Sequence, residues 1–225
     1  MAKENKVEEQ RQEGIEASVS KTEQFFQKNK KSIRITCGVI LVVGLMILGY
    51  QKLVREPRIV EAMDQMFPAE LCFQDGNFET ALNGDGNILG FTQIIDEYGA
   101  KAGKSVYIYA GICCLQMGDN EQALEYLKKY NGKDPIILAR AYALQGDACV
   151  NLEQYNKALD FYRKAVAQAD NMYAAAYLLK EGQVYEALGR KDEAVECYKE
   201  IKDKYPQSFE GYLIQSNIEG AKIAE

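Results

Sequence analysis

The side chains that most often carry catalysis and metal binding are scarce in this chain. Histidine is absent from all 225 residues, which removes the commonest general base and a frequent zinc and iron ligand. The acidic pairs Asp96-Glu97 and Asp192-Glu193 have the character of solvated helix faces, and no glycine-rich phosphate loop follows a strand. We therefore expect no catalytic residue, no metal site and no cofactor, and the prediction is that the protein is not an enzyme.

Cysteine is the remaining residue type that could do chemistry. The chain has six, none of them in a C-x-x-C pair, so their spacing does not indicate a metal site. One, Cys37, lies in a long apolar run, and the other five are an odd number for a disulfide framework. We interpret these five as small apolar core residues, with their redox state left open: Cys72, Cys113, Cys114, Cys149 and Cys197.

The apolar run extends from Ile35 to Gln51, 17 residues without a charge. As a helix it would reach roughly 26 Å at about 1.5 Å per residue. Leu53 and Val54 extend the reach, because Lys52 can direct its ammonium outward. This length suits a bilayer core of about 30 Å. No small-x-small cleavage site follows, so we predict a retained transmembrane span over about residues 35–54 rather than a removed signal peptide.

Basic residues around the run predict its orientation. Within about 15 residues the N-terminal side has more bases than the C-terminal side, which favours a cytoplasmic N-terminus. These bases are Lys21, Lys28, Lys30, Lys31 and Arg34 before the run, and Lys52, Arg55 and Arg58 after it. We expect a flexible cytoplasmic tail over 1–19, a juxtamembrane and transmembrane helix over 20–56, and a domain over 57–225 in the periplasm of a bacterium. The net charge of −6 argues against nucleic acid as a partner.

Beyond residue 57 the chain repeats itself. Three segments share a small residue, a turn and an alanine, and the alanines Ala123, Ala158 and Ala194 are 35 and 36 residues apart. The small residues Gly111, Gly146 and Gly182 would let paired helices approach closely. The pattern resembles the tetratricopeptide repeat family, whose unit is a helix–turn–helix of about 34 residues.

A fourth, weaker copy precedes these three. Ala69 and Ala81 fit the same frame, but Ala123 follows 42 residues after Ala81 because of the turn-forming insert Asn83-Gly84-Asp85-Gly86-Asn87. The insert lacks the acidic ladder of an EF-hand, so calcium binding is not expected. Residues 208–223 are interpreted as a final helix that covers the last repeat. The predicted fold is all-α, with a single N-terminal transmembrane helix, a tetratricopeptide-repeat α-solenoid and a C-terminal capping helix.

The first helices of the repeats would form a groove for partner proteins. Apolar members of this set could instead pack against neighbouring helices, and that alternative stays open. Ile108 and Ile112 stand where a carboxylate-binding groove would carry polar residues, which disfavours that mode of binding. The predicted groove residues are Met63, Met66, Glu70, Phe73, Ile108, Ile112, Leu115, Arg140, Asp147, Leu179, Gln183 and Glu186.

The order of these segments resembles the YfgM-like ancillary subunits of the SecYEG translocon. The resemblance rests on Phe25-Phe26-x-Lys28-x-x-Lys31, on the span with Val39-Ile40-Leu41-Val42-Val43-Gly44 and Gly49-Tyr50, and on the repeats. The insert followed by Gly90-Phe91 is similar to the Bacteroidota form. Arg55-Glu56-Pro57 departs from the proteobacterial pattern, and Pro57 should break or restart the helix.

This resemblance implies a single-pass protein of the bacterial inner membrane, with periplasmic repeats and no catalytic residues. Its implied partners are the SecYEG channel, a membrane-anchored periplasmic chaperone and emerging polypeptides. The resulting hypothesis is an adaptor that assists biogenesis of secreted or membrane proteins. The alternatives are an outer-membrane protein assembly factor and a self-associating envelope scaffold, and the oligomeric state stays open.

Overall fold

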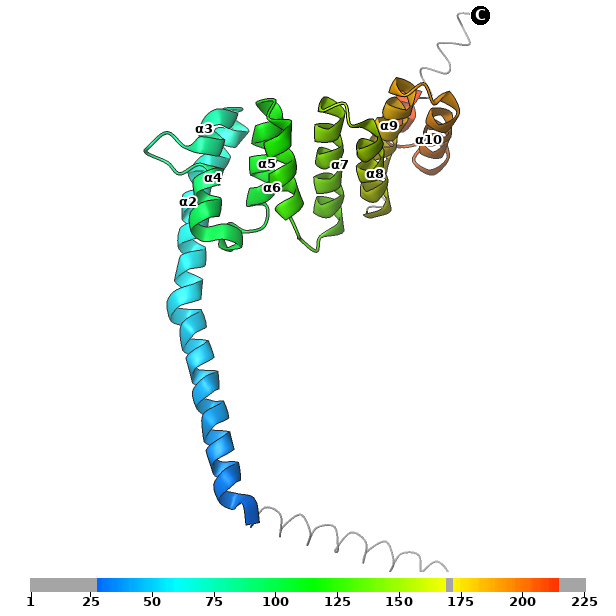
Figure 1. Cartoon of the computed structure of the whole chain (residues 1–225). Coiled ribbons are helices and arrows are strands. Elements are labelled where there is room, and N and C mark those ends of the chain that lie inside the picture. The colour runs from blue at the N-terminus through cyan, green and yellow to red at the C-terminus, as the bar shows by residue number, and fades with distance from the viewer. Residues whose placement is uncertain (1–27, 169–171, 215–225) are drawn as a thin grey trace, which may run out of the picture. The chain divides into compact units, whose positions relative to one another are not determined.

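The computed structural model describes residues 28–168 and 172–214 (Figure 1). The chain divides into two compact units, residues 1–57 and residues 58–225. Every regular element within the described residues is a helix. The all-α prediction is therefore confirmed, whereas the predicted boundaries of tail, anchor and repeat domain stay predictions.

The first unit is dominated by the apolar run. Residues 28–50 are helical, and a π-helical turn, η1 (Gln51–Arg55), follows. The helical stretch Lys28–Gln74 is long and apolar enough to cross a membrane, and none of its apolar window is buried. This is the property expected of a segment that meets lipid. The predicted tail and the first residues of the predicted helix, 20–27, lie outside the described residues.

Helical backbone continues through Pro57, where the sequence predicted a break or a restart. α2 (Glu56–Gln74) begins one residue earlier. The amide of Glu56 donates to the carbonyl of Gln51, five residues back, which is the π-helical pattern. Pro57 lies inside this continuous helix and lacks an amide, so one backbone hydrogen bond is missing there, and the π-helical turn directly before it is the local irregularity that accommodates the proline.

The second unit is a row of paired helices (Figure 1). Each helix from α5 onward packs against the next one in the chain, which is the arrangement of a repeat array. After α2 the elements are α3 (Phe78–Asn83), α4 (Phe91–Tyr98), η2 (Gly99–Ala102), α5 (Val106–Gln116), α6 (Asn120–Lys129), α7 (Pro135–Asn151), α8 (Tyr155–Gln168), α9 (Met172–Ala187) and α10 (Lys191–Lys204). Residues 209–214 are helical, and the remainder of the predicted capping helix lies outside the described residues.

Glycine lets the paired helices approach closely, as the sequence predicted. A Cβ atom added at Gly146 would lie 2.5 Å from Cε1 of Tyr162, and one added at Gly182 would lie 2.4 Å from Cε1 of Tyr198. In the preceding pair, Leu127 fills the equivalent space against Gly111. A side chain on any of these glycines would overlap the partner helix, so the small residue sets the spacing within each pair.

The insert of the weak copy divides the second helix of that repeat into α3 and α4. The base of the insert is closed by direct backbone packing: a Cβ on Gly90 would lie 2.3 Å from the Gly84 nitrogen and 2.4 Å from the Leu82 carbonyl oxygen. The Thr92 hydroxyl donates to the same Leu82 oxygen at 2.8 Å. The two short helices are thus held together around a pinched loop.

The tip of the insert is organised by Asp85. Its Oδ1 accepts hydrogen bonds from the amides of Asn87 at 2.8 Å and Ile88 at 3.0 Å. These bonds hold the pKa of the Asp85 carboxyl below its usual range. No cluster of His, Cys, Asp or Glu side chains suited to a metal ion occurs in the described part of the chain.

The apolar interior of the array falls into two main cores. The first, here called the N-terminal core, includes Phe91, Ile94 and Val106, and the second, the C-terminal core, includes Tyr162 and Tyr185. In the N-terminal core, Phe91 stacks on Tyr109 with a centroid distance of 5.3 Å, and Phe73 packs edge-on against both rings. A smaller cluster of Ile108, Tyr130 and Ala141 lies between them along the array.

Candidate binding surface

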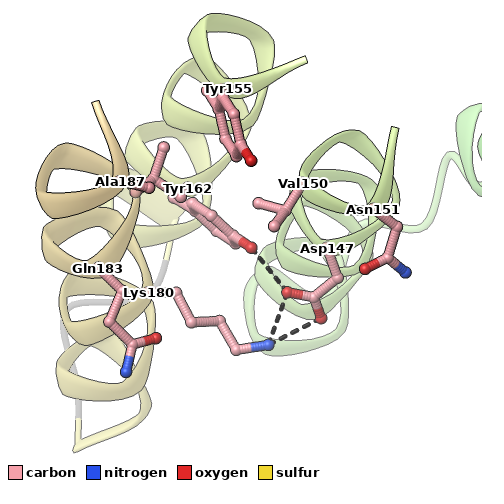
Figure 2. Close-up of a pocket in the computed structure, with 9 residues that line it drawn as sticks. Asp147, Val150, Asn151, Tyr155, Tyr162, Lys180, Gln183 and Ala187 are labelled. Carbon is pink, nitrogen blue, oxygen red and sulfur yellow. Dashed lines mark hydrogen bonds and ion pairs between the residues drawn. The ribbon is translucent and has the colours of Figure 1, made fainter. Parts of the chain in front are cut away.

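A pocket of about 320 Å³ opens between α7, α8 and α9. We call it the α7–α9 pocket (Figure 2). Three consecutive helices contribute to it, so its shape depends on how the second and third repeats pack. Its lining residues are Asp147, Val150, Asn151, Tyr155, Tyr162, Lys180, Gln183, Val184 and Ala187.

Asp147 is the polar centre of the pocket. The Tyr162 hydroxyl donates to its Oδ1 at 2.7 Å, and Lys180 Nζ lies 2.7 Å from both of its oxygens. Figure 2 shows these three side chains converging from α7, α8 and α9. Burial, and next the negative charge of Asp147, raises the pKa of Tyr162, so this hydroxyl stays a donor. The triad ties the three helices together and leaves the carboxylate neutralised.

The rest of the pocket is apolar with amide groups at its edge. Val150, Val184 and Ala187 supply the apolar part, while Gln183 is exposed. Asn151 also bridges to α6 by donating to Oδ1 of Asn120 at 2.8 Å. Such a lining suits an apolar side chain of a peptide, with amides available to its backbone. Its chemistry is that of binding rather than of proton or group transfer.

A second polar cluster joins α8 to α9, and its members are bonded to one another. Glu181 has a side chain only 8% exposed, and Arg163 Nε lies 2.9 Å from its Oε1. Arg163 also donates to the Tyr185 hydroxyl, and Arg190 lies over the Tyr185 ring at 4.7 Å from its centroid. Burial raises the pKa of Glu181, and the hydrogen bond from Arg163 opposes that effect. This cluster stabilises the packing of α8 against α9.

Part of the predicted groove is brought together. Asp147 and Gln183 line the same pocket. Arg140 is exposed on α7 and Glu70 is half-buried on α2. Burial raises the pKa of Tyr109, Glu70 adds to that shift and Arg140 opposes it, so both charges act on the same hydroxyl of α5. These residues of the first helices therefore share one region of the array.

Other predicted groove residues are packed instead. Met66 and Ile108 are 5% and 7% exposed and belong to the apolar interior, which withdraws them from a free surface. Met63 is exposed on α2, and Glu186 is exposed beside the Tyr198 hydroxyl of α10. The predicted residues that are half-buried against core clusters are Phe73, Ile112, Leu115 and Leu179.

Sequence reasoning missed several lining residues. Lys180, Asn151 and Tyr155 were not among the predicted groove residues, although the first two have a recognisable spacing. Asn151 follows Asp147 by four residues and Lys180 precedes Gln183 by three, so each shares a helix face with a predicted residue. Tyr155 gave no such signal, because it begins the second helix of its repeat.

The cysteines are located in the core, as predicted for four of the five beyond the apolar run. Cys113, Cys114, Cys149 and Cys197 are buried and all six cysteines are free. Burial raises the pKa of Cys113 and of Cys197 to about 12, and that of Cys114 to about 11. These thiols therefore stay protonated and poorly nucleophilic.

This burial predicts alkaline destabilisation. An unfolded thiol loses its proton near pH 9, whereas the buried Cys197 thiol keeps it to about pH 12. Between these values the unfolded state binds fewer protons than the folded state, so the free energy of unfolding falls as pH rises. At pH 10.5 the loss is on the order of 2 kcal/mol per thiol. Urea unfolding at pH 8 and pH 10.5 measures the loss. Cys197→Ala should lose less stability over this range, and an equal loss would contradict the prediction.

Two stretches of the chain, residues 139–171 and 176–208, match family models described as tetratricopeptide repeat. They coincide with the helix pairs α7–α8 and α9–α10. The array is a tetratricopeptide-repeat solenoid. Such repeats are typically protein-interaction modules, and no enzymatic family is indicated.

Known proteins resemble the array over part of its length. Protein bimA of Emericella nidulans is 37% identical over 81 residues, which cover 36% of this chain and 10% of that protein. Because the matched segment is a tenth of that protein, the similarity concerns the repeats alone.

Solved structures of MamA superpose on the array. One has a TM-score of 0.52 with 23% identity and covers 66% of this chain and 74% of that chain. The MamA RS-1 double mutant has a TM-score of 0.52 with 18% identity and covers 69% and 79% of the two chains. At these identities the likeness concerns the fold alone.

Proposed function

We propose that this protein is a membrane-anchored tetratricopeptide-repeat adaptor of the bacterial inner membrane, with its repeats in the periplasm. Its role would be that of an accessory of the Sec translocon that assists biogenesis of secreted or membrane proteins. The main support for this proposal is that one chain combines an unburied apolar helix with a repeat array that has an open pocket. The partners proposed are the SecYEG channel, a membrane-anchored periplasmic chaperone and emerging polypeptides.

The proposed location is supported by the apolar helix and its flanking charges. No part of the apolar window is buried, so the helix is not a core helix of the array. Five bases before the run against three after it favour a cytoplasmic N-terminus. The repeat domain would then stand on the side where secreted chains emerge.

The proposed binding mode is supported by the α7–α9 pocket. Lys180 and Asp147 neutralise one another, so the pocket offers no strong net charge, and apolar groups with edge amides remain for a partner. A polypeptide in extended form could place a side chain against Val150 and Val184 and its backbone beside Gln183. This mode would select shape and apolar character rather than one sequence.

Site-specific photo-crosslinking tests the proposal in living cells. A photoreactive amino acid in place of Gln183, in the full membrane-bound chain, should crosslink to Sec channel subunits, to a periplasmic chaperone or to exported polypeptides. The same amino acid in place of Lys202, exposed on α10 and outside the pocket, is the control and should give fewer than about a tenth of these products. Recovery of outer-membrane assembly proteins, or of this chain alone, at Gln183 would overturn the proposal in favour of an assembly factor or a self-associating scaffold.

A further inference from the structure

The outer face of α2 carries an apolar stripe that no described residue covers. Val60, Met63, Phe67 and Leu71 are 58%, 59%, 61% and 44% exposed. Their spacing of three and four residues places them on one side of the helix. The other side of α2 is packed, with Ala62 and Ala69 fully buried in the N-terminal core. Four large apolar side chains in a row on a helix that is already packed on its other side indicate an interaction surface.

The stripe has an acidic border. Asp64 lies four residues after Val60 and three before Phe67, and Glu70 lies three after Phe67, so the two carboxylates flank the stripe. Residues 58–100 contain eight acidic residues and one basic residue, Arg58 in the first turn of α2, while residues 101–225 are nearly balanced, with 18 acidic and 16 basic. The ion pairs in the part of the chain that the structure describes all join residues beyond 146. Asp64 and Glu70 are therefore in none of these ion pairs, and the segment around the stripe keeps an excess of negative charge.

The acidic border of the stripe favours some binding partners over others. Two copies of α2 meeting face to face would bring the acidic borders together, and like charges across an interface are costly. Anionic lipid is disfavoured for the same reason. A helix with an apolar face and lysine or arginine at its edges fits both the stripe and its border. We propose that the outer face of α2 is a docking surface for a basic amphipathic helix of a partner protein, distinct from the α7–α9 pocket.

Peptide binding to the full chain in nanodiscs of zwitterionic lipid tests this proposal. The probes are two labelled helical peptides with the same leucine face, one with lysine and one with glutamate at its edges. The lysine peptide should bind at least tenfold more tightly than the glutamate peptide and should weaken as salt is raised. Phe67→Ser should weaken binding of the lysine peptide at least fivefold. Asp64→Lys should weaken it by as much and should also reduce the dependence of binding on salt.

Matched controls lie at the other end of the array. Phe209→Ser and Asp192→Lys change exposed residues of the same kinds outside α2 and should leave binding within twofold. Equal binding of the two peptides, or binding unchanged by Phe67→Ser, would overturn the proposal. Equal binding of the lysine peptide to empty nanodiscs would also overturn the proposal, because the peptide would then be adsorbing to lipid. A dimer of the unmodified chain that Phe67→Ser dissociates would overturn it as well, because the stripe would then bind a second copy of this chain.

Discussion

Arg163→Ala should lower the free energy of unfolding of the array by about 2 kcal/mol. The substitution leaves the Glu181 carboxylate, whose side chain is 8% exposed, without its ion-pair partner. Removing one member of a buried pair costs about 3–5 kcal/mol. The expected loss is smaller because the Arg163 side chain is 53% exposed, so water screens the pair. Urea unfolding followed by circular dichroism measures the effect.

The double variant Arg163→Ala/Glu181→Leu should recover most of the lost stability, because no buried charge then remains. The loss in Arg163→Ala alone should also shrink as pH falls toward 5. The pKa of Glu181 is already raised by burial and would rise further without Arg163, so the carboxyl takes up a proton. Lys204→Ala, which removes the base of an exposed ion pair with Glu200, is the control and should cost less than about 0.5 kcal/mol. A double variant no more stable than the single one would contradict this account.

Gly90→Ala should lower the free energy of unfolding of the array by about 2–4 kcal/mol. The new Cβ would lie 2.3 Å and 2.4 Å from backbone atoms of Gly84 and Leu82. Backbone cannot rotate away as a side chain can, so α3 and α4 would have to separate and disturb Phe91, which is fully buried. Thermal unfolding of the membrane-bound chain, or of residues 58–225 if they fold alone, measures the loss.

Gly86→Ala is the matched comparison for this loop. Gly86 has nothing within 4 Å of an added Cβ, but its φ of +90° strains any other residue. Gly86→Ala should therefore lower the free energy of unfolding by about 1 kcal/mol, through backbone strain alone. If Gly86→Ala proved as damaging as Gly90→Ala, the closed base of the insert would not be what holds α3 against α4.

The repeat architecture could be predicted from sequence because a few positions carry it. Gly146 and Gly182 are spaced like Ala158 and Ala194, and the structure shows that each glycine accommodates a tyrosine of the partner helix. The turn between paired helices was less regular. Glu153 adopts φ 57°, where the equivalent turns have Gly118 and Gly189. Few non-glycine residues adopt this conformation, so this turn was recognised from the repeat spacing rather than from its composition.

The exposure of individual groove residues could not be predicted from spacing alone, because a helix inside an array packs on more than one side. That the groove binds a partner stays a prediction. Helical periodicity grouped Met66 with Met63, yet Met66 points into the N-terminal core and Met63 into solvent. Ile108 was assigned to the groove on the same basis, and its burial depends on Tyr130 and Ala141, which are distant in sequence. Such contacts follow from the stacking of repeats, which the spacing within one repeat does not encode.

The apolar interior of the array is divided into separate clusters along its length. Each helix touches mainly its neighbours, so a repeat array distributes deformation unevenly along its length. The cluster of Ile108, Tyr130 and Ala141 is a small contact between two larger ones. Flexing at this junction would alter the curvature of the array while leaving each half intact. At this junction a change of curvature to fit a bulky client would require no repeat to unfold.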